Sequence, residues 1–403
     1  MTKSVSSSAK KLAVVVSHPI QYHVPFYRRI AQEKDLELRV IFASRAGVSS
    51  YFDRDMRTEL SWNTDLLAGY DHEFLPGADE IKQITVKALD SPGLEQCLAD
   101  FAPDAVLVYG YATPNARRTM RWARRYDAAV LYQSDSELVH SRSTWRKALK
   151  RLIVPYIFRK IDGFLAIGSR NRDYYLHYGV PDRKVFKTPF TIDQPAFEAA
   201  AAKRDIARRA LRWQLHLPDD ACIALFAGKF APHKRPIDLL RALERVEREQ
   251  PGSLHIVFAG DGVLRPELES LTRELNLPAH FLGFVNLDRL PDVYAAADML
   301  ILASEIDAYG LVCSEAACCS LPLITSDHVG AVGPEDIARS GENAIVYPCG
   351  DVEALADAMI ELATSPAKRA TMGDASRAVF SSLDTEASLA GLKRALATCV
   401  KQH

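Results

Sequence analysis

The stretch Ala303–Pro322, ASEIDAYGLVCSEAACCSLP, indicates both the fold and the chemistry of this chain. Its pattern predicts the end of a buried strand, a loop that carries Asp307, and a helix that begins near Leu311. The first N–H groups of such a helix have no partner within the helix, so they can bind an anion. Glu315 follows Asp307 by eight positions and would project from the first helical turns. The two carboxylates are therefore expected on either side of one anion site.

Carboxylates beside an anion site suit a ligand that carries both phosphate and hydroxyl groups. A carboxylate accepts charge-assisted hydrogen bonds from a vicinal diol and leaves the phosphate to the backbone amides. A nucleotide sugar has this combination of groups. The alternative is an ordinary strand, loop and helix whose acids cap the helix and complement its dipole.

A second segment, Ala227–Pro236 (AGKFAPHKRP), has the same order of strand, glycine turn and helix. It follows the apolar run Cys222–Phe226 and precedes a helical pattern over Ile237–Glu249. Lys229 and Lys234 flank the turn, and two ammonium groups could neutralise a departing diphosphate without a metal. The alternative is a pair of solvated loop lysines.

Together the two segments resemble the donor-binding domain of retaining glycosyltransferases with the GT-B fold, in glycosyltransferase family four (group 1). The family pattern of Glu-x7-Glu and Gly-Arg…Lys reads here as Asp-x7-Glu and Gly-Lys…Lys. The resemblance implies diphosphate contacts from Lys229 and Lys234 and ribose contacts from Glu315. It implies that the sugar is bound by Asp307 and by the backbone of Tyr309, Gly310, Leu311 and Val312, and that Gly228 forms the turn before Lys229.

The aspartate at position 307 departs from the family pattern and shortens the side chain by one methylene, about 1.5 Å. Glu305 could take its place. On an extended loop residues 305 and 307 face opposite ways, so only one of them can enter the site. The distance to the Tyr309-Gly310 turn favours Asp307. The replacement leaves the donor class unchanged and makes the identity of the sugar less certain.

The resemblance continues along the second half of the chain. The strand Leu254–Ala259 ends in Gly260-Asp261-Gly262, and Gly283-Phe284-Val285 follows a further strand. In the family the latter turn contacts the nucleobase, which makes Gly283, Phe284 and Val285 the base-site candidates, with a core position for Phe284 equally open. A nicotinamide site is poorly supported, because the Gly260-x-Gly262 pair lacks a third glycine at dinucleotide spacing.

The amino-terminal half opens with the apolar run Leu12–Val16, which predicts a buried strand, and with a helical pattern over Val24–Gln32. The loop between them carries His18, Gln21 and His23, at the strand end where open α/β sheets place ligands. The sequence His-Pro-Ile-Gln-Tyr-His resembles a subgroup associated with polysaccharide and other cell-surface glycan assembly, which implies acceptor-side roles. For each histidine a hydrogen bond to the backbone is an equally open interpretation.

The strand Ala129–Tyr132 is followed by Gln133-Ser134-Asp135-Ser136-Glu137. The family often has a histidine near this point, close to the reacting sugar. Here Asp135 or Glu137 could orient or deprotonate the acceptor hydroxyl, with Asp135 the catalytic candidate. The alternative is that both acids cap helices.

Length and composition predict two domains, since 403 residues with 48% hydrophobic content exceed what one core usually serves. By resemblance these are two Rossmann-like α/β domains with parallel sheets that face a cleft. We expect an acceptor domain over 1–195, a donor domain over 196–383, and a helix within 384–403 that crosses back to the first domain. Residues Met1–Lys10 are expected to form a disordered tail, and no run is long enough to span a bilayer.

The two halves carry opposite charge: residues 1–195 have 29 basic minus 22 acidic residues, or +7, and residues 196–403 have 21 minus 29, or −8. Within Arg142–Lys160, basic residues alternate at helical spacing with Trp145, Leu149, Leu152, Ile153 and Tyr156. This helix could contact a membrane surface that carries a lipid-phosphate acceptor. The alternative is an amphipathic helix packed on its own sheet. No motif supports nucleic-acid binding.

The sequence thus predicts a metal-independent transfer of a sugar from an NDP-sugar, with a UDP-sugar favoured, to an acceptor hydroxyl with retention. No cofactor is expected, and the leaving phosphate would help to deprotonate the acceptor. The acceptor would be a glycan, a lipid-linked molecule or a small molecule, in the cytoplasm or at the inner face of the membrane. The alternatives are a nucleotide-sugar epimerase, a transferase acting on a small metabolite, and an inactive nucleotide-sugar-binding scaffold.

Overall fold

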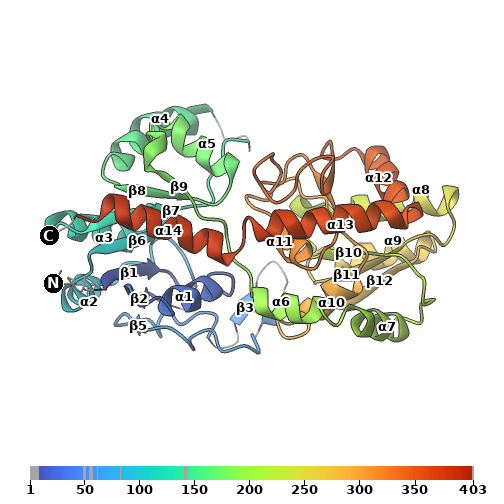
Figure 1. Cartoon of the computed structure of the whole chain (residues 1–403), viewed down its shortest axis with the longest axis horizontal. Helices are drawn as coiled ribbons and strands as arrows, with labels where there is room; N and C mark the ends of the chain where they lie inside the picture. Colours follow the sequence, from blue (N-terminus) through green and yellow to red (C-terminus); the bar gives the residue numbers. More distant parts are fainter. Residues whose placement is uncertain are drawn as a thin grey trace, which may run out of the picture. The chain divides into compact units, whose positions relative to one another are not determined.

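The computed structural model describes residues 9–48, 51–53, 58–60, 62–81, 83–139 and 144–401. Side chains are not described for residues 51–53, 58–60 and 144–148. The chain divides into two compact units (Figure 1). Unit 1 comprises Met1–Tyr51, Asp65–Thr191 and Thr385–His403, and unit 2 comprises Phe52–Thr64 and Ile192–Asp384.

Unit 1 contains a seven-stranded sheet in the order β5-β2-β1-β6-β7-β8-β9, and its strand pairs are parallel. Helices from the connecting segments cover it, because parallel strands need crossover connections. Its elements are β1 (Lys10–Val16), α1 (Val24–Ala31), β2 (Leu36–Phe42), β5 (His72–Phe74), α2 (Leu94–Phe101), β6 (Ala105–Tyr109), α3 (Pro114–Arg125), β7 (Ala129–Gln133), α4 (Thr144–Phe158), β8 (Gly163–Ala166), α5 (Ser169–His177), β9 (Val185–Lys187) and α14 (Thr385–Cys399).

Unit 2 contains a six-stranded parallel sheet in the order β12-β11-β10-β13-β14-β15. A short pair, β3 (Tyr51–Asp53) and β4 (Thr58–Leu60), precedes it in the chain. The remaining elements are α6 (Gln194–Ala201), α7 (Arg204–Gln214), β10 (Ile223–Ala227), α8 (Pro236–Glu249), β11 (His255–Ala259), α9 (Arg265–Glu274), β12 (Ala279–Gly283), α10 (Leu290–Ala296), β13 (Met299–Leu302), α11 (Leu311–Cys318), β14 (Leu323–Ser326), β15 (Ala344–Tyr347), α12 (Val352–Thr364) and α13 (Pro366–Ser381).

The central strands of both sheets contain continuous apolar runs because helices cover both faces. Residues Leu12–Val16 of β1 and Ile223–Ala227 of β10 are all buried. Local signals begin several helices: the hydroxyl of Thr113 accepts the N–H of Ala116 at the start of α3, and Pro114 occupies its first turn.

In each sheet the strand order reverses beside the first strand of the unit, between β1 and β6 and between β10 and β13. Open parallel sheets bind ligands at such a point, outside the carboxyl ends of the strands. In unit 2 the loops after β10 and β13 begin at Gly228 and Ala303. The topology therefore brings the two segments that the sequence singled out to the same edge of one sheet.

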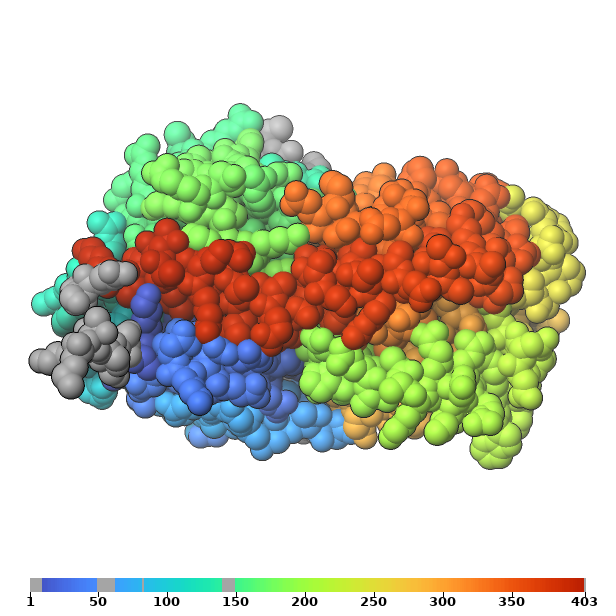
Figure 2. Space-filling model, in the orientation of Figure 1, coloured from blue at the N-terminus to red at the C-terminus, as the bar shows by residue number. Residues whose placement is uncertain are grey.

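The final helix, α14, lies with unit 1 and packs beside α1 (Figure 2). Arg29 forms an ion pair with Glu386, and the hydroxyl of Ser388 donates to the Pro189 carbonyl at 2.7 Å. Gly391 permits close approach, since a Cβ there would lie 2.0 Å from the Lys187 carbonyl oxygen. The segment Phe52–Thr64 lies with unit 2, although the sequence-based division placed it in the first domain.

Helix α4 packs on the core of its own unit, as one sequence-based alternative expects, but not through the apolar residues that the sequence singled out. Leu149, Leu152, Ile153 and Tyr156 are exposed. The buried side of α4 is formed by Val154 and by Phe158. The side chain of Trp145 and the residues before Thr144 lie outside the described part. Among the described helices, none combines the length and apolar character needed to cross a membrane.

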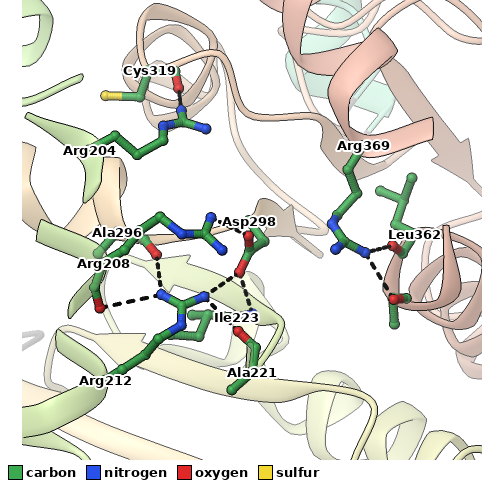
Figure 3. A network of polar contacts seen from close by, with 11 residues as sticks. Arg204, Arg208, Arg212, Ala221, Ile223, Ala296, Asp298, Cys319, Leu362 and Arg369 are labelled. Atoms are coloured by element: carbon green, nitrogen blue, oxygen red, sulfur yellow. Dashed lines mark hydrogen bonds and ion pairs between the residues drawn. The ribbon is translucent and has the colours of Figure 1, made fainter. Parts of the chain in front are cut away.

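A buried ion pair joins α7 to the amino-terminal ends of two strands in unit 2 (Figure 3). Arg212, 1% exposed, donates to Asp298 at 2.9 Å, and Arg208 donates to the other carboxylate oxygen at 2.5 Å. Asp298 also accepts the backbone N–H of Ile223 at 2.9 Å. Arg212 further donates to the carbonyls of Ala221 and Ala296. Most polar atoms of this cluster are thus satisfied, as burial of charge requires.

We predict that Asp298→Ala destabilises unit 2 by about 3–5 kcal/mol, because it leaves the Arg212 guanidinium buried without its counter-ion. Urea unfolding of the full chain measures the loss. Asp182→Ala is the matched control, since the Asp182–Arg172 pair is 64% and 43% exposed, and exposed pairs contribute only about 0–1 kcal/mol. Equal losses in the two variants would contradict the role of the Asp298 cluster.

Candidate active site

The structure brings together two residues that lie 73 positions apart, Lys234 after β10 and Asp307 after β13. The Lys234 ammonium lies 2.6 Å from one carboxylate oxygen of Asp307. The other carboxylate oxygen accepts the backbone N–H of Gly310, at the start of α11, at 2.8 Å. A cation, a carboxylate and a helix N-terminus therefore meet at the strand edge where the sheet order reverses.

Backbone contacts hold these two loops in register. The N–H of Glu305 donates to the His233 carbonyl at 2.8 Å, and the Asp307 carbonyl accepts the N–H of Gly330 at 2.8 Å. Gly310 has φ of +78°, and a Cβ there would lie 2.7 Å from Val329. A side chain at position 310 would thus be strained and also clash, which explains the glycine between loop and helix.

Asp307 and Glu305 occupy different surroundings. The Asp307 side chain is 15% exposed and faces Lys234. The Glu305 side chain is 51% exposed and lies 3.5 Å from Arg235. Of the two acids, Asp307 is thus the one that borders the start of α11.

Glu315 lies in α11 one turn beyond its start and accepts a hydrogen bond of 2.5 Å from the Tyr294 hydroxyl. Burial raises the pKa of Glu315 to about 7, and the Tyr294 hydrogen bond acts in the opposite direction. Tyr294 is fully buried in α10. It was not predicted as a site residue, because the apolar pattern of its helix does not indicate that its hydroxyl contacts Glu315. The carboxylate is held in one orientation and gains stability when a ligand supplies more donors.

The glycine turn after β10 packs against the loop after β11. The N–H of Gly228 donates to the Ala259 carbonyl at 3.0 Å, and the N–H of Phe230 donates to the backbone carbonyl of Asp261 at 2.8 Å. A Cβ on Gly260 would lie 1.9 Å from the Gly228 carbonyl oxygen, so glycine is required for this approach. Lys229, between these contacts, is half-buried.

The predicted base segment lies at the end of β12, beside the same loops. Gly283, Phe284 and Val285 are all half-buried, and the Gly283 carbonyl accepts the N–H of Gly260 at 2.8 Å. Phe284 is only half-buried, so it is not a core residue. The centroid of its ring lies 5.9 Å from that of Trp62. Trp62 was missed because it belongs to an irregular segment with no motif spacing.

The remaining donor-site candidates lie around the start of α11. Tyr309 and Gly310 are buried, and Leu311 and Val312 are half-buried. The donor-site residues predicted from sequence thus lie at the end of β12, in the loops that follow β10, β12 and β13, or in the first turns of α11.

Unit 1 contains a cavity of about 500 Å³ at the carboxyl ends of β1, β6 and β7. Its walls are mainly apolar and aromatic, with a few polar groups, as small-molecule sites usually are. The lining residues important here are Tyr22, His23, Ile84, Val86, Tyr109, Tyr111, Tyr132, Ser134, Asp135, Lys150 and Phe190. Of the five acceptor-side candidates, His23 and Asp135 line this cavity; His18, Gln21 and Glu137 are not among its described lining residues.

His23 is buried among aromatic rings, with ring centroids 4.4 Å from Tyr109 and 4.6 Å from Tyr22. Burial, reinforced by His18, lowers the pKa of His23 to about 3. Burial lowers the pKa of His18 to about 4, and its Nδ1 lies 2.8 Å from the Ser17 hydroxyl. Both rings are therefore neutral near pH 7. Gln21 is half-buried on the same loop.

The loop of Asp135 and Glu137 is held by neighbouring helix side chains. The Tyr175 hydroxyl accepts the N–H of Ser134 at 3.0 Å, and the Asn171 amide donates to the Ser136 carbonyl at 2.8 Å. Asp135 is exposed at the cavity, and Glu137 is half-buried. The helix-cap alternative is wrong for both acids, because residues 134–139, which include and follow them, are not helical.

Among the described residues, no group of three or more histidine, cysteine, aspartate or glutamate side chains could hold a metal ion. All seven cysteines are free thiols, and those at positions 313, 318 and 319 are buried as small apolar side chains.

Part of unit 2 matches one known protein family in sequence. Residues 207–379 match the family described as "Glycosyl transferases group 1". A protein of Xylanimonas cellulosilytica named D-inositol 3-phosphate glycosyltransferase is 30% identical over 210 residues, which cover 50% of this chain and 48% of that protein. A protein of the same name from Rhodococcus erythropolis is 34% identical over 173 residues. The chain spans about half the length, or less, of these curated relatives.

Solved structures match nearly the whole chain at low sequence identity. HepE of Anabaena, in complex with UDP, has a TM-score of 0.71 and 16% identity, and covers 96% of this chain and 99% of its own. Sucrose-phosphate synthase of Thermosynechococcus elongatus has a TM-score of 0.68 and 21% identity, with coverage of 96% and 99%. These likenesses, together with the two parallel α/β sheets, show that the chain has the GT-B fold.

Proposed function

We propose that the protein is a glycosyltransferase that moves a sugar from a nucleoside diphosphate sugar, UDP being the favoured nucleotide, to an acceptor hydroxyl. The observation that carries the proposal is the meeting of Lys234, Asp307 and the start of α11 at the point where the sheet order of unit 2 reverses. The group 1 match over residues 207–379 supports it, and so does the likeness to a protein solved with UDP.

In this proposal Lys229, Lys234 and the N–H groups at the start of α11 stabilise the charge that develops on the departing diphosphate. Glu315 accepts hydrogen bonds from the ribose hydroxyls. Asp307, with the backbone of residues 309–312, binds the sugar. The nucleobase lies against Gly283-Phe284-Val285.

The acceptor would bind in the cavity of unit 1. Neutral His23 would pack against it, and Asp135 would orient its hydroxyl or accept the proton. The proposal includes retention at the anomeric carbon, metal independence, and departure and attack on one face, with the leaving phosphate helping to remove the proton. It also includes a role in polysaccharide or other glycan assembly, in the cytoplasm or at the inner face of the membrane. Seven free thiols fit a reducing compartment.

A small-molecule acceptor is the second candidate, and the names of the curated relatives favour it. These relatives match over about half their length or less, so their acceptor is not transferred to this chain. Incubation with inositol phosphate or with a lipid-linked sugar would separate the two acceptor classes.

The first test is thermal unfolding with UDP, GDP, ADP and their sugar conjugates. We expect UDP and UDP-sugars to raise the Tm and Glu315→Ala to remove most of that shift. Glu353→Ala is the control, because Glu353 is a 75% exposed acid that pairs with Arg245. Absence of a Tm shift with every nucleotide tested would contradict the proposed donor site. A shift without transfer or donor hydrolysis would favour an inactive scaffold, and a new NDP-sugar made without acceptor would favour an epimerase.

The pKa of Glu315 leads to a pH dependence. Between its usual pKa and about 7 the folded chain holds a proton that the unfolded chain releases, so this group favours folding at low pH and that contribution is lost as the pH rises through 7. Ribose binding needs the carboxylate. The affinity for UDP-glucose should therefore rise by up to about tenfold from pH 6 to pH 8. Isothermal titration calorimetry measures this, and Glu315→Gln should bind more weakly with a flatter profile. Identical profiles would argue against ribose binding by Glu315.

Asp307 and Glu305 can be compared directly, since they lie two positions apart. We expect Asp307→Ala to lower kcat by about 10²-fold or more, because both the sugar contact and the partner of Lys234 are lost. Glu305→Ala should change kcat by less than about threefold, because its side chain is half exposed and paired with Arg235. Steady-state kinetics with a UDP-sugar measures both. The reverse order would assign the sugar contact to Glu305.

A further inference from the structure

The outward side of α4 carries an unusual row of exposed apolar side chains. Leu149, Leu152, Ile153 and Tyr156 are 47%, 77%, 45% and 62% exposed. Their spacing of three, four and seven positions places them on one side of a helix. Val154 and Phe158, which are buried, occupy the inner side. The helix thus has an apolar side for its own core and a second one that the described residues of its unit leave exposed.

Positive charge surrounds this row. The segment Thr144–Lys160 contains six lysine or arginine residues and no aspartate or glutamate. Arg151 and Arg159 are exposed, and the Lys160 ammonium lies 4.2 Å from the centre of the Tyr156 ring. Long basic side chains beside exposed leucine, isoleucine and tyrosine are typical of helices that lie in the interface of an anionic membrane.

The charge argues against a second copy of this chain as the partner. A two-fold dimer would place this basic side against itself and bring like charges together, and the segment Thr144–Lys160 has no acid of its own to compensate them. An anionic lipid surface compensates the charge and accepts the apolar side chains at once. The complementarity therefore favours lipid.

Helix α4 is also part of the cavity in unit 1. Lys150, adjacent to Leu149, lines that cavity, and so do Ile84 and Val86, which are 39% and 51% exposed. In Figure 1 the helix lies at the outer edge of its own unit. A molecule anchored in the membrane would thus meet apolar side chains and a basic group at the proposed acceptor cavity.

We propose that the outward side of α4, formed by Leu149, Leu152, Ile153 and Tyr156 with the adjacent basic residues, docks on an anionic lipid surface. The docking places the cavity of unit 1 where a lipid-borne acceptor can enter. The identity of that acceptor rests on the proposed function, whereas the docking itself does not.

The test is co-sedimentation of the full chain with phosphatidylcholine vesicles and with vesicles that also contain phosphatidylglycerol. The wild type should bind the anionic vesicles more tightly, and added salt should weaken the binding. Leu152→Ser with Tyr156→Ser should reduce binding by about tenfold or more. Arg151→Gln with Arg159→Gln should reduce it in anionic vesicles and leave the weak phosphatidylcholine binding unchanged.

Tyr126→Ser is the matched control for Tyr156→Ser. Tyr126 is 57% exposed, belongs to the same unit, and has the Arg125 guanidinium 5.8 Å from its ring. Its vesicle binding should equal that of the wild type. Circular dichroism confirms folding of each variant, and the Tm shift with UDP, unchanged in the α4 variants, keeps a failure of docking separate from a failure of the donor site.

Absence of wild-type binding to anionic vesicles would overturn the proposal, as would equal binding by the α4 double variant. Light scattering adds a further check. A concentration-dependent dimer that the Leu152→Ser, Tyr156→Ser variant abolishes would assign this side of α4 to a second copy instead.

Discussion

The sheet of unit 2 depends on one buried carboxylate, Asp298. It precedes β13 and accepts hydrogen bonds from Arg212, from Arg208 and from the first amide of β10. The same residue donates its own N–H to the Ile223 carbonyl at 2.8 Å. Because β10 and β13 are the strands between which the sheet order reverses, this cluster sets their register at one end. The register decides which loop residues face each other at the other end.

At that other end the geometry is sensitive to small displacements. The Lys234 ammonium and an Asp307 carboxylate oxygen form an ion pair of 2.6 Å. The loops carry glycines at positions where a Cβ would collide with a neighbouring backbone or side chain. Pairing that is fixed at one end of two parallel strands is also fixed at the other end. The buried ion pair at the amino-terminal ends of β10 and β13 therefore helps to position the loops at their carboxyl ends. The cost of burying Asp298 and Arg212 is offset by backbone carbonyls and amides that would otherwise need partners themselves.

Unit 1 uses the same sheet topology with a different surface. Its cavity is lined by aromatic rings, and the histidines of its first loop are held neutral by burial instead of serving as cations. Basic residues of this half are grouped in α3 and in Thr144–Lys160, and the outward side of α4 is also apolar. Recognition of an uncharged or lipid-borne molecule in the cavity and electrostatic attraction at the surface would thus be separate properties.

Strand and helix positions followed from local pattern, because buried parallel strands are continuous apolar runs and helices begin at recognisable turns. The helix predicted over Val24–Gln32 is α1, which ends one residue earlier, and the helix predicted over Ile237–Glu249 is α8, which begins one residue earlier. The two segments that follow β10 and β13 were also recognisable, because in each of them a strand, a glycine turn and a helix follow one another within a short stretch of residues. That much the sequence determined by itself.

Contacts between distant segments were decided only by the tertiary structure. Tyr294 reaches Glu315 across 21 positions and Trp62 reaches Phe284 across more than two hundred, which no local spacing encodes. The raised pKa of Glu315 depends on everything packed around it. The apolar row of α4 was visible in sequence, but helical periodicity is the same for a buried side and an exposed one. Only the packing of Val154 and Phe158 on the core decided which side faces outward.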